Sequence, residues 1–286
     1  MAVLETQDLT YTYAAGSPFE MHALRGVSFS TRPGELLGII GHTGSGKSTL
    51  VQHLNGLLRP TAGRVLLDGR DIWEEPKKIR AVRFRVGMVF QYPEHQLFAE
   101  TVFEDIAFGP RNKGVEEEAV AKQVREAMEF VGLDYETFAQ RSPFQLSGGQ
   151  MRRVAIAGVV AMNPDYLVLD EPSAGLDPRS RNAVFKEIMS LHKSRGIAIV
   201  LVTHSMEEAV KYADRLLVIN AGKVLFDGTP AEIFKEHAAE LVEVGVDVPQ
   251  VYKLADLLRQ SGVALPENIK DDVSLVKAIK KAKGWK

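Results

Sequence analysis

The sequence predicts an α/β fold built on a mainly parallel sheet. From Tyr166 onward, stretches with strand and helix patterns alternate, which favours parallel strands covered by helices. A glycine-rich loop, Gly41 to Ser48, follows one predicted strand and precedes a predicted helix. Between about residues 92 and 160, amphipathic helical spacing takes the place of strands. We therefore expect a core α/β domain that is interrupted by a helical insertion.

The individual elements follow from local patterns. Strands are expected where short apolar runs are rich in β-branched residues, at residues 3–9, 26–31, 35–40, 64–67, 86–90, 166–169, 197–202, 215–219 and 223–226. Helices are expected where apolar residues recur at helical spacing, at residues 47–58, 116–130, 148–161, 180–194, 206–213, 230–237, 249–261 and 273–283. We divide the chain into a main domain, residues 1–238, and a C-terminal helical extension, residues 239–286.

Composition is typical of a soluble globular protein. Of the 286 residues, 25% are charged and 45% hydrophobic, and the net charge is −2, so nothing global suggests a nucleic-acid partner. Two basic runs, residues 77–85 and 277–283, are expected to be solvated helix faces. The chain has no cysteine, hence no disulfide or thiolate metal site. No apolar run approaches the roughly 20 residues that cross a bilayer, so membrane work would need spanning partners.

The glycine-rich loop fits the pattern G-x-x-x-x-G-K-[ST] of a phosphate-binding loop. Its backbone N–H groups and the following helix N-terminus suit phosphate oxygens. We expect Lys47 to reach the β- and γ-phosphates of ATP, Ser48 to ligate Mg²⁺ and Thr49 to support the α-phosphate. His42 is at a free position of the motif and is assigned no chemistry. The residues expected to line the ATP site are Gly41, His42, Thr43, Gly44, Ser45, Gly46, Lys47, Ser48 and Thr49.

A predicted buried strand, Leu167 to Leu169, ends in two carboxylates. Asp170 is expected to organise Mg²⁺ through water, and Glu171 to orient and deprotonate the attacking water. Phosphoryl transfer depends mainly on positioning and charge stabilisation, so these few groups suffice. Strands that end in acidic residues are common and need not be catalytic. The phosphate-binding loop in the same chain favours the catalytic interpretation.

The element Leu146-Ser147-Gly148-Gly149-Gln150 precedes that strand. Together with the phosphate loop, Gln91, the two carboxylates and His204, it resembles the ATP-binding cassette (ABC) family. The resemblance implies a P-loop NTPase of the ABC ATPase fold, with a mainly parallel core sheet, an antiparallel β subdomain, the helical insertion and the C-terminal helical extension.

The resemblance also implies roles at single positions. Gln91 would touch Mg²⁺ and water, His204 would contact the γ-phosphate, and Tyr13 would stack on adenine. Without the resemblance, His204 would be read as structural, and Tyr11 is an alternative to Tyr13 or both are simple strand aromatics. The element from Leu146 to Gln150 is called the signature element. Four of its residues would bind ATP held on a partner subunit: Ser147, Gly148, Gly149 and Gln150. A further loop would cross the dimer interface: Ser173, Gly175, Leu176 and Asp177.

Three features resemble the energy-coupling factor (ECF) importers, in particular their second, A-prime type ATPase, which is CbiO-like. They are the phosphate loop with its continuation to Leu58, the stretch from Gln91 to Pro110, and the helical tail after about Ala239. The tail resembles the extension that helps to pair the two ATPases of such importers, so the resemblance implies a role in dimerisation for residues 239–286. This implies a peripheral protein at the cytoplasmic membrane face that pairs with a related ATPase and works with a transmembrane T subunit and substrate-binding S subunits in vitamin or micronutrient uptake. Glu94 and Gln96 would line the T-subunit groove, with Glu94 facing arginines; Glu94 could instead be a solvated carboxylate.

Two other interpretations stay open. One is the single ATPase of a cobalt or nickel importer, working as a homodimer. The other is a soluble cassette protein that acts on ribosomes or DNA; such relatives usually carry two cassettes or a long coiled coil, and this chain has one phosphate loop and one signature element.

Overall fold

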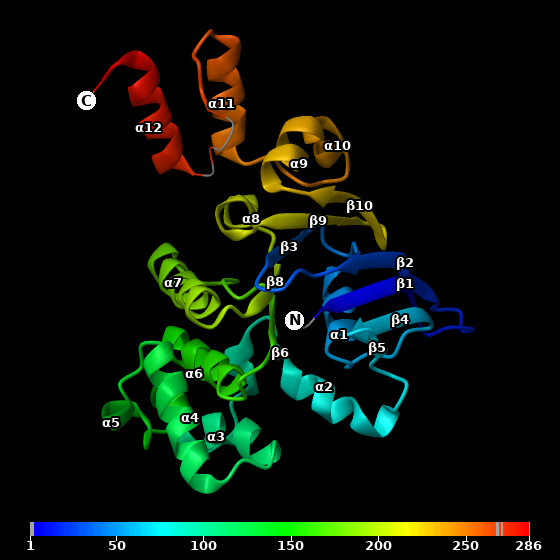
Figure 1. The fold of residues 1–286 in the computed structure, drawn as a ribbon, viewed down its shortest axis with the longest axis vertical. Helices are drawn as coiled ribbons and strands as arrows, with labels where there is room; N and C mark the ends of the chain where they lie inside the picture. The colour runs from blue at the N-terminus through cyan, green and yellow to red at the C-terminus, as the bar shows by residue number, and fades with distance from the viewer. Residues whose placement is uncertain (1–2, 267–268, 270, 286) are drawn as a thin grey trace.

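The computed structural model describes residues 3–266, 269 and 271–285, and it contains two sheets. The larger sheet has the strand order β10-β9-β3-β8-β7-β6, in which all neighbours are parallel except β10 and β9. The smaller sheet, β2-β1-β4-β5, is antiparallel and lies beside it (Figure 1). The predicted α/β fold with a parallel core and an antiparallel part is thus confirmed.

The strands have bounds close to those expected, with longer strands in the antiparallel sheet. They are β1 Leu4–Tyr13, β2 Met21–Ser30, β3 Leu36–Ile40, β4 Ala62–Leu67, β5 Arg70–Asp71, β6 Val86–Val89, β7 Tyr166–Asp170, β8 Ala198–Val202, β9 Arg215–Asn220 and β10 Lys223–Gly228. β2 begins five residues earlier than residue 26, where the sequence pattern placed it, because it pairs with β1 as far as Met21.

The helices cover the larger sheet and form the insertion. They are α1 Lys47–Leu54, α2 Ile79–Arg85, α3 Val102–Asn112, α4 Glu117–Phe130, α5 Tyr135–Phe138, α6 Gly148–Val160, α7 Pro178–Arg195, α8 Met206–Tyr212, α9 Pro230–Glu236, α10 Ala238–Glu243, α11 Gln250–Gln260 and α12 Asp272–Lys283. The expected helix at residues 47–58 ends at Leu54, since Asn55 and Gly56 turn the chain. Three helices were not predicted individually, namely α3, α5 and α10, and neither was the short strand β5.

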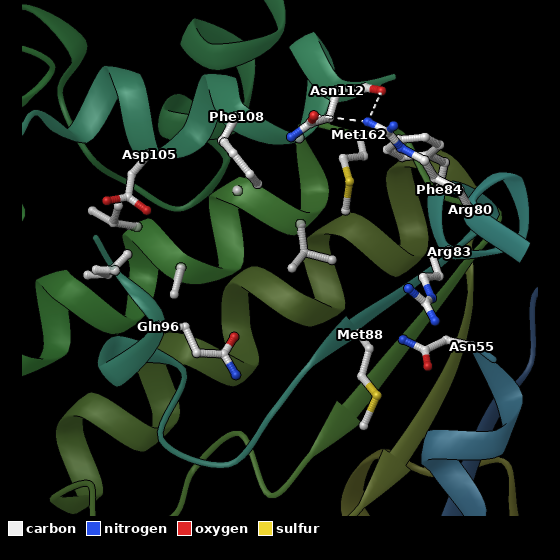
Figure 2. A pocket seen from close by; sticks show the side chains of 16 residues that line it. Asn55, Arg80, Arg83, Phe84, Met88, Gln96, Asp105, Phe108, Asn112 and Met162 are labelled. Carbon is white, nitrogen blue, oxygen red and sulfur yellow. Dashed lines mark hydrogen bonds between the residues drawn. The ribbon is translucent and has the colours of Figure 1, made fainter. Parts of the chain in front are cut away.

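The helical insertion borders a groove of about 510 Å³ (Figure 2). Its walls come from α2, α3 and α6 and from the loop after β6, and they include Gln96, Phe108 and Met162. The basic run at residues 77–85 contributes Arg80, whose guanidinium donates to the backbone and side-chain oxygens of Asn112 at 2.8 and 2.9 Å. The lining of the groove therefore mixes apolar side chains with polar and charged ones.

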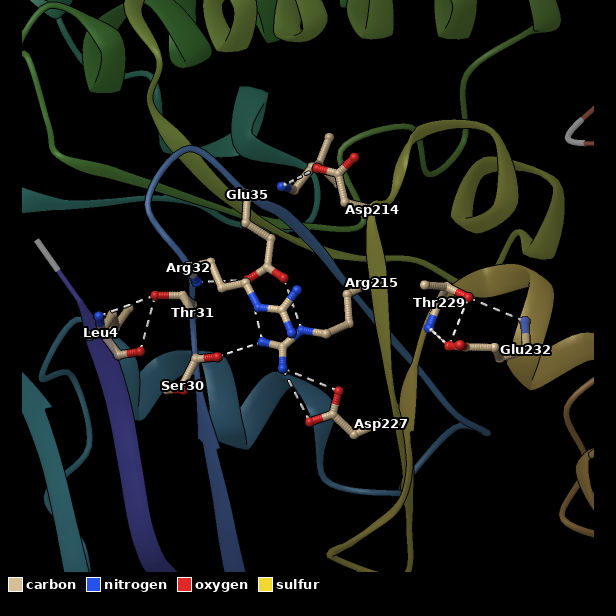
Figure 3. Close-up of polar contacts among 11 residues, drawn as sticks. Leu4, Ser30, Thr31, Arg32, Glu35, Asp214, Arg215, Asp227, Thr229 and Glu232 are labelled. Carbon is tan, nitrogen blue, oxygen red and sulfur yellow. Dashed lines mark hydrogen bonds and ion pairs between the residues drawn. The ribbon is translucent and has the colours of Figure 1, made fainter. Parts of the chain in front are cut away.

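The two sheets are joined at their edge by Arg215, at the start of β9 (Figure 3). Its guanidinium donates to Glu35 at 2.9 Å, to Asp227 at 3.2 Å and to the carbonyl oxygen of Ser30 at 2.5 Å. Arg215 and Glu35 are largely buried, with side-chain exposures of 12% and 5%. This network fixes β3, which leads to the phosphate loop, against β2 and β10.

The C-terminal helices continue the core of the main domain. Val248, Tyr252 and Leu275 are buried in the same apolar cluster as the strands of the larger sheet. The ring of Phe234 in α9 lies 5.6 Å from that of Tyr252 in α11. In Figure 1, α11 and α12 lie beyond α9 and α10, at the end of the molecule that carries β10. The boundary at residue 239 and the dimerisation role of the extension stay predictions.

Sheet register decides where the functional segments end. Ile39 of β3 pairs with Val202 of β8, and Val202 pairs with Asp170 of β7. Val89 of β6 pairs with Leu169. Because parallel strands finish at one edge, the loops that follow β3, β6, β7 and β8 meet there.

Candidate active site

A cavity of about 500 Å³ opens at this edge. It is lined by residues of the phosphate loop, of β2 and of the loops after β6, β7 and β8: Met21, His22, Ala23, Thr43, Gly44, Gly46, Lys47, Ser48, Thr49, Gln91, Glu171 and His204. Of the residues assigned from the sequence, the cavity thus brings together six from the phosphate loop and the start of α1 with Gln91, Glu171 and His204. The remaining assigned residues of this region are not among the lining residues: Gly41, His42, Ser45 and Asp170. Met21, His22 and Ala23 were missed, since no motif marks them.

The phosphate loop has backbone conformations that only glycine adopts readily. Gly41 has a φ of 152°, and a Cβ there would lie 2.2 Å from the carbonyl oxygen of Ile219. Gly46, the Ncap of α1, has a φ of 107°, and its Cβ would lie 2.6 Å from the carbonyl oxygen of Ala23. Glycine at these two positions therefore lets the loop pack closely against β9 and β2. Lys47, Ser48 and Thr49, the first residues of α1, line the cavity, and the N-terminus of a helix suits a phosphate group.

Lys47 bends back over the loop. Its Nζ donates to the carbonyl oxygens of Gly41 and His42 at 2.8 and 2.9 Å. Burial lowers the pKa of Lys47, and the charges of Glu171 and Asp170 oppose that shift. The ammonium group is thus held beside the cavity by backbone oxygens that phosphate oxygens can replace. His42 contributes one of the two carbonyl oxygens that Lys47 contacts. The ring Nδ1 of His42 is 2.6 Å from the carbonyl oxygen of Thr43.

Asp170 carries an unused acceptor. Burial raises its pKa, while a hydrogen bond from Ser48 lowers it and the charge of Glu171 raises it further. Within the described part of the chain, its Oδ1 is buried and has no hydrogen-bond partner. An orphaned carboxylate oxygen beside the Ser48 hydroxyl fits a hard cation such as Mg²⁺. Residues 3–266, 269 and 271–285 contain no group of three His, Cys, Asp or Glu side chains that could hold a metal ion.

Glu171 is held from both sides. Gln91 Nε2 donates to its Oε2 at 2.9 Å, and His204 Nε2 is 2.5 Å from its Oε1. Glu171 has a φ of 50°, a strained conformation for this residue type, and strain of this kind tends to occur at functional positions. The carboxylate therefore projects into the cavity with its orientation fixed by two groups that the sequence had assigned to the same site.

Tyr13 lies beside the start of α1. Its hydroxyl lies 3.2 Å from Thr49 Oγ1, and its ring meets that of Tyr11 edge-on at 4.8 Å. Met21 of β2 lines the cavity and is 57% exposed. Stacking of Tyr13 on adenine stays a prediction.

The signature element begins α6. Ser147 is the Ncap and forms a capping box with Gln150, in which Ser147 Oγ accepts from the backbone N–H of Gln150. A Cβ at Gly148 would meet no described atom within 4 Å, and at Gly149 only Ser180 at 3.9 Å. All four residues lie outside the lining of the cavity. Their expected action on a partner's nucleotide stays a prediction.

The expected interface loop is only partly exposed. Gly175 and Asp177 are exposed, and Asp177 caps α7 by accepting from the backbone N–H groups of Arg179 and Ser180. Leu176 is half-buried against the core. Ser173 is buried and donates to Glu208 at 2.7 Å. Ser173 thus faces the inside of its own chain.

Glu94 also faces inward, contrary to the expectation that it lines a docking groove. Its carboxylate accepts from Arg152 at 2.8 and 2.9 Å, and the Arg152 side chain is only 1% exposed. Burial raises the pKa of Glu94, but the hydrogen bonds and charge of Arg152 hold it below the usual range. Glu94 is therefore engaged within the chain, because a buried guanidinium needs a counter-charge. Gln96, in contrast, is exposed and lines the groove.

The fold and this site define a nucleotide-hydrolysing cassette, and the family comparison agrees. The family model "ABC transporter" matches residues 24–174. The chain is 52% identical, over 92% of its own length and 91% of the relative's, to a protein of Clostridioides difficile (strain 630) named energy-coupling factor transporter ATP-binding protein EcfA2. The chain therefore belongs to the ABC transporter family, as one of its ATPases.

Solved structures show the same fold. The structure of cbiO1 from Clostridium perfringens, described as part of the ABC transporter complex cbiONQ, has a TM-score of 0.74, is 37% identical, and covers 88% of this chain and 98% of its own. The dimeric post-hydrolysis structure of the ATP-binding cassette MJ0796 bound to ADP and Pi has a TM-score of 0.71, is 29% identical, and covers 79% of this chain and 98% of its own.

The buried ion pair gives a prediction about stability. Glu94→Gln leaves the buried guanidinium of Arg152 without a counter-charge, so we expect the free energy of unfolding to fall by about 2–3 kcal/mol. Urea unfolding followed by circular dichroism measures it. The exposed Glu100→Gln, six residues along the chain, is the matched control and should change stability by less than about 0.5 kcal/mol. Equal effects of the two substitutions would contradict the structural importance of the pair.

Proposed function

We propose that this chain is the ATP-hydrolysing subunit of an ECF importer and that Glu171 is its catalytic base. The observation that carries the proposal is the Glu171 carboxylate, fixed between Gln91 and His204 beside the phosphate loop. The 52% identity to an EcfA2 protein supports the importer class. The conditions for phosphoryl transfer, a phosphate cradle and an oriented base, are met in one cavity.

In the proposed mechanism, the chain's residues bind the triphosphate and hold the attacking water. Lys47 exchanges its two carbonyl partners for β- and γ-phosphate oxygens, and the N–H groups at the start of α1 bind the phosphates. Mg²⁺, when held by Ser48 and Asp170 with Gln91 nearby, supplies positive charge to the phosphate oxygens. Glu171 accepts the proton of the water at a carboxylate oxygen. His204, whose Nε2 contacts that carboxylate, holds it in place beside the γ-phosphate.

The proposed working state contains two ATPases. The open glycine surface at Gly148 and Gly149 is free to approach a phosphate on another subunit at the N-terminus of α6. Exposed apolar side chains on the C-terminal helices suit a contact between subunits: Leu254, Leu257, Val273 and Val276. We propose that a related ATPase is the partner, as in the expected heterodimer.

We propose that the groove of Figure 2 receives a transmembrane T subunit, which also binds small substrate-binding S subunits. Gln96, Phe98 and Phe108 are exposed at or beside this groove, and the two phenyl rings meet edge-on at 5.0 Å. An apolar surface rimmed by polar groups is typical of a protein-binding site. No helix in the described part of the chain is long and apolar enough to span a bilayer. We also propose that the chain is a peripheral protein at the cytoplasmic face of the cell membrane.

A second candidate is the ATPase of a cobalt or nickel importer that works as a homodimer. The likeness to cbiO1, which is described as part of the ABC transporter complex cbiONQ and has a TM-score of 0.74, is compatible with this candidate. The identity to that structure is 37%, against 52% to the EcfA2 protein, so the ECF interpretation ranks first.

The catalytic assignment predicts a separation of binding from turnover. Glu171→Gln keeps the shape of the side chain but cannot accept the proton, so we expect ATP turnover to fall by roughly 10²–10⁴. ATP binding, measured by equilibrium dialysis, should stay within about threefold, because the phosphates are held by other groups. Glu118→Gln, an exposed position on α4, is the matched control. Turnover near the wild-type value in Glu171→Gln would refute the assignment.

The docking assignment predicts which chains co-purify. The tagged protein is isolated from gently solubilised native membranes, and its companions are identified by mass. We expect a second ATPase, one T-type protein and small membrane proteins, and Phe108→Glu should remove the membrane chains by placing a charge in the groove. Leu225→Glu, at an exposed apolar position on β10, should leave them bound.

The other outcomes separate the alternatives. Recovery of this ATPase alone with membrane subunits of a metal importer would favour the homodimer. If no membrane protein co-purifies, the transporter proposal is wrong. If the Phe108→Glu and Leu225→Glu variants bind the membrane chains equally well, the groove is not the docking site.

A further inference from the structure

A buried carboxylate outside the cavity joins two catalytic loops. Glu208 lies in α8 and is 5% exposed. Its Oε1 accepts from Ser173 Oγ at 2.7 Å, and its Oε2 accepts from Thr203 Oγ1 at 2.6 Å. Arg181 Nε, on a half-exposed side chain of α7, lies 3.6 Å from Oε1. Both oxygens of Glu208 therefore have specific donors.

These donors belong to the segments that carry Glu171 and His204. Ser173 follows Glu171 by two residues, and Thr203 directly precedes His204. The backbone N–H of Glu171 donates to the carbonyl oxygen of Val202 at 3.0 Å, so the two segments are already adjacent. Glu208 forms a second link between the two segments, because it accepts hydrogen bonds from the side chains of Ser173 and Thr203.

The link extends into the backbone that follows His204. Thr203 Oγ1, which donates to Glu208, accepts from the backbone N–H of Ser205 at 3.0 Å. Ser205 Oγ in turn accepts from the backbone N–H of Glu208 and caps α8. Hydrogen bonds to an ionised acceptor are shorter and stronger than neutral ones, and here they are shielded from water. The residues on both sides of His204 are thus tied to one carboxylate.

We propose that Glu208 is a positioning residue for ATP hydrolysis. It fixes the 2.5 Å contact between Glu171 and His204 by holding Ser173 and Thr203 at a constant separation. This inference rests on the proposed catalytic roles of Glu171 and His204. Glu208 lies outside the lining of the cavity, so it acts on turnover and leaves ATP binding to the phosphate loop.

The test separates turnover from binding in the full-length protein with the subunits that co-purify with it. Glu208→Ala should lower kcat by roughly 10- to 100-fold, because small misplacements of a catalytic group are costly. KM for ATP should change by less than about threefold, since groups that bind the phosphates are untouched. Glu208→Gln should fall between wild type and Glu208→Ala, because an amide oxygen still accepts one of the two hydroxyl bonds.

A pair of substitutions at Thr203 tests the same link with little change of shape. Thr203→Val removes the hydroxyl that donates to Glu208, and Thr203→Ser keeps it. We expect Thr203→Val to lower kcat by roughly 10-fold, with KM for ATP unchanged, and Thr203→Ser to restore most of the rate. In the Glu208→Ala background, Thr203→Val should lower kcat little further, because the effects of substitutions within one hydrogen-bond network are not additive. This pair carries the test if Glu208→Ala fails to fold.

Controls separate this proposal from the one on which it rests. Glu207→Ala changes the neighbouring exposed carboxylate and should keep wild-type kcat. Glu171→Gln in the same preparation reports on the catalytic site itself. If Glu171→Gln is inactive while Glu208→Ala and Thr203→Val turn over within twofold of wild type, the positioning role is wrong. A loss of kcat that Thr203→Ser does not restore would equally overturn it.

Discussion

The buried guanidinium of Arg152 is the contact on which the arrangement of the functional loops most depends. It pairs with Glu94 in the segment after Gln91, and it also donates to the carbonyl oxygens of Pro172 and Ala174 at 3.2 and 2.8 Å. Arg152 lies on α6, the helix that starts with the signature element. One side chain thereby ties three segments together, and a charge with so little access to water holds its partners strongly.

Glu208 complements this contact at the same point of the loop. Arg152 binds the backbone on either side of Ser173, whereas Glu208 binds the Ser173 side chain. The segment that follows Glu171 is thus held by one positive and one negative group, each buried. The partners of Arg152 and Glu208 lie on several different loops. A movement of one of these loops would therefore break hydrogen bonds to a buried charge unless the other loops moved with it.

The sequence was most informative where function needs a contiguous pattern. The phosphate loop, the Asp170–Glu171 pair and the alternation after Tyr166 could be identified because each is local, and sheet register then brings them to one edge. Glu94 was misjudged because its partner lies 58 positions away, and burial of a loop carboxylate cannot be read locally. Helix α3 went unpredicted, although its Thr101 cap bonds the Glu104 N–H. Met21 lines the cavity only because β2 packs beside the phosphate loop.

The bent conformation of Lys47 bears on how firmly the phosphate loop is shaped. Its Nζ donates to the carbonyl oxygens of Gly41 and His42, which lie six and five residues earlier in the chain. The Lys47 side chain is also buried, so these two bonds are shielded from water. The loop is therefore shaped by contacts within its own chain, and a ligand that binds a preorganised loop loses less free energy to ordering it.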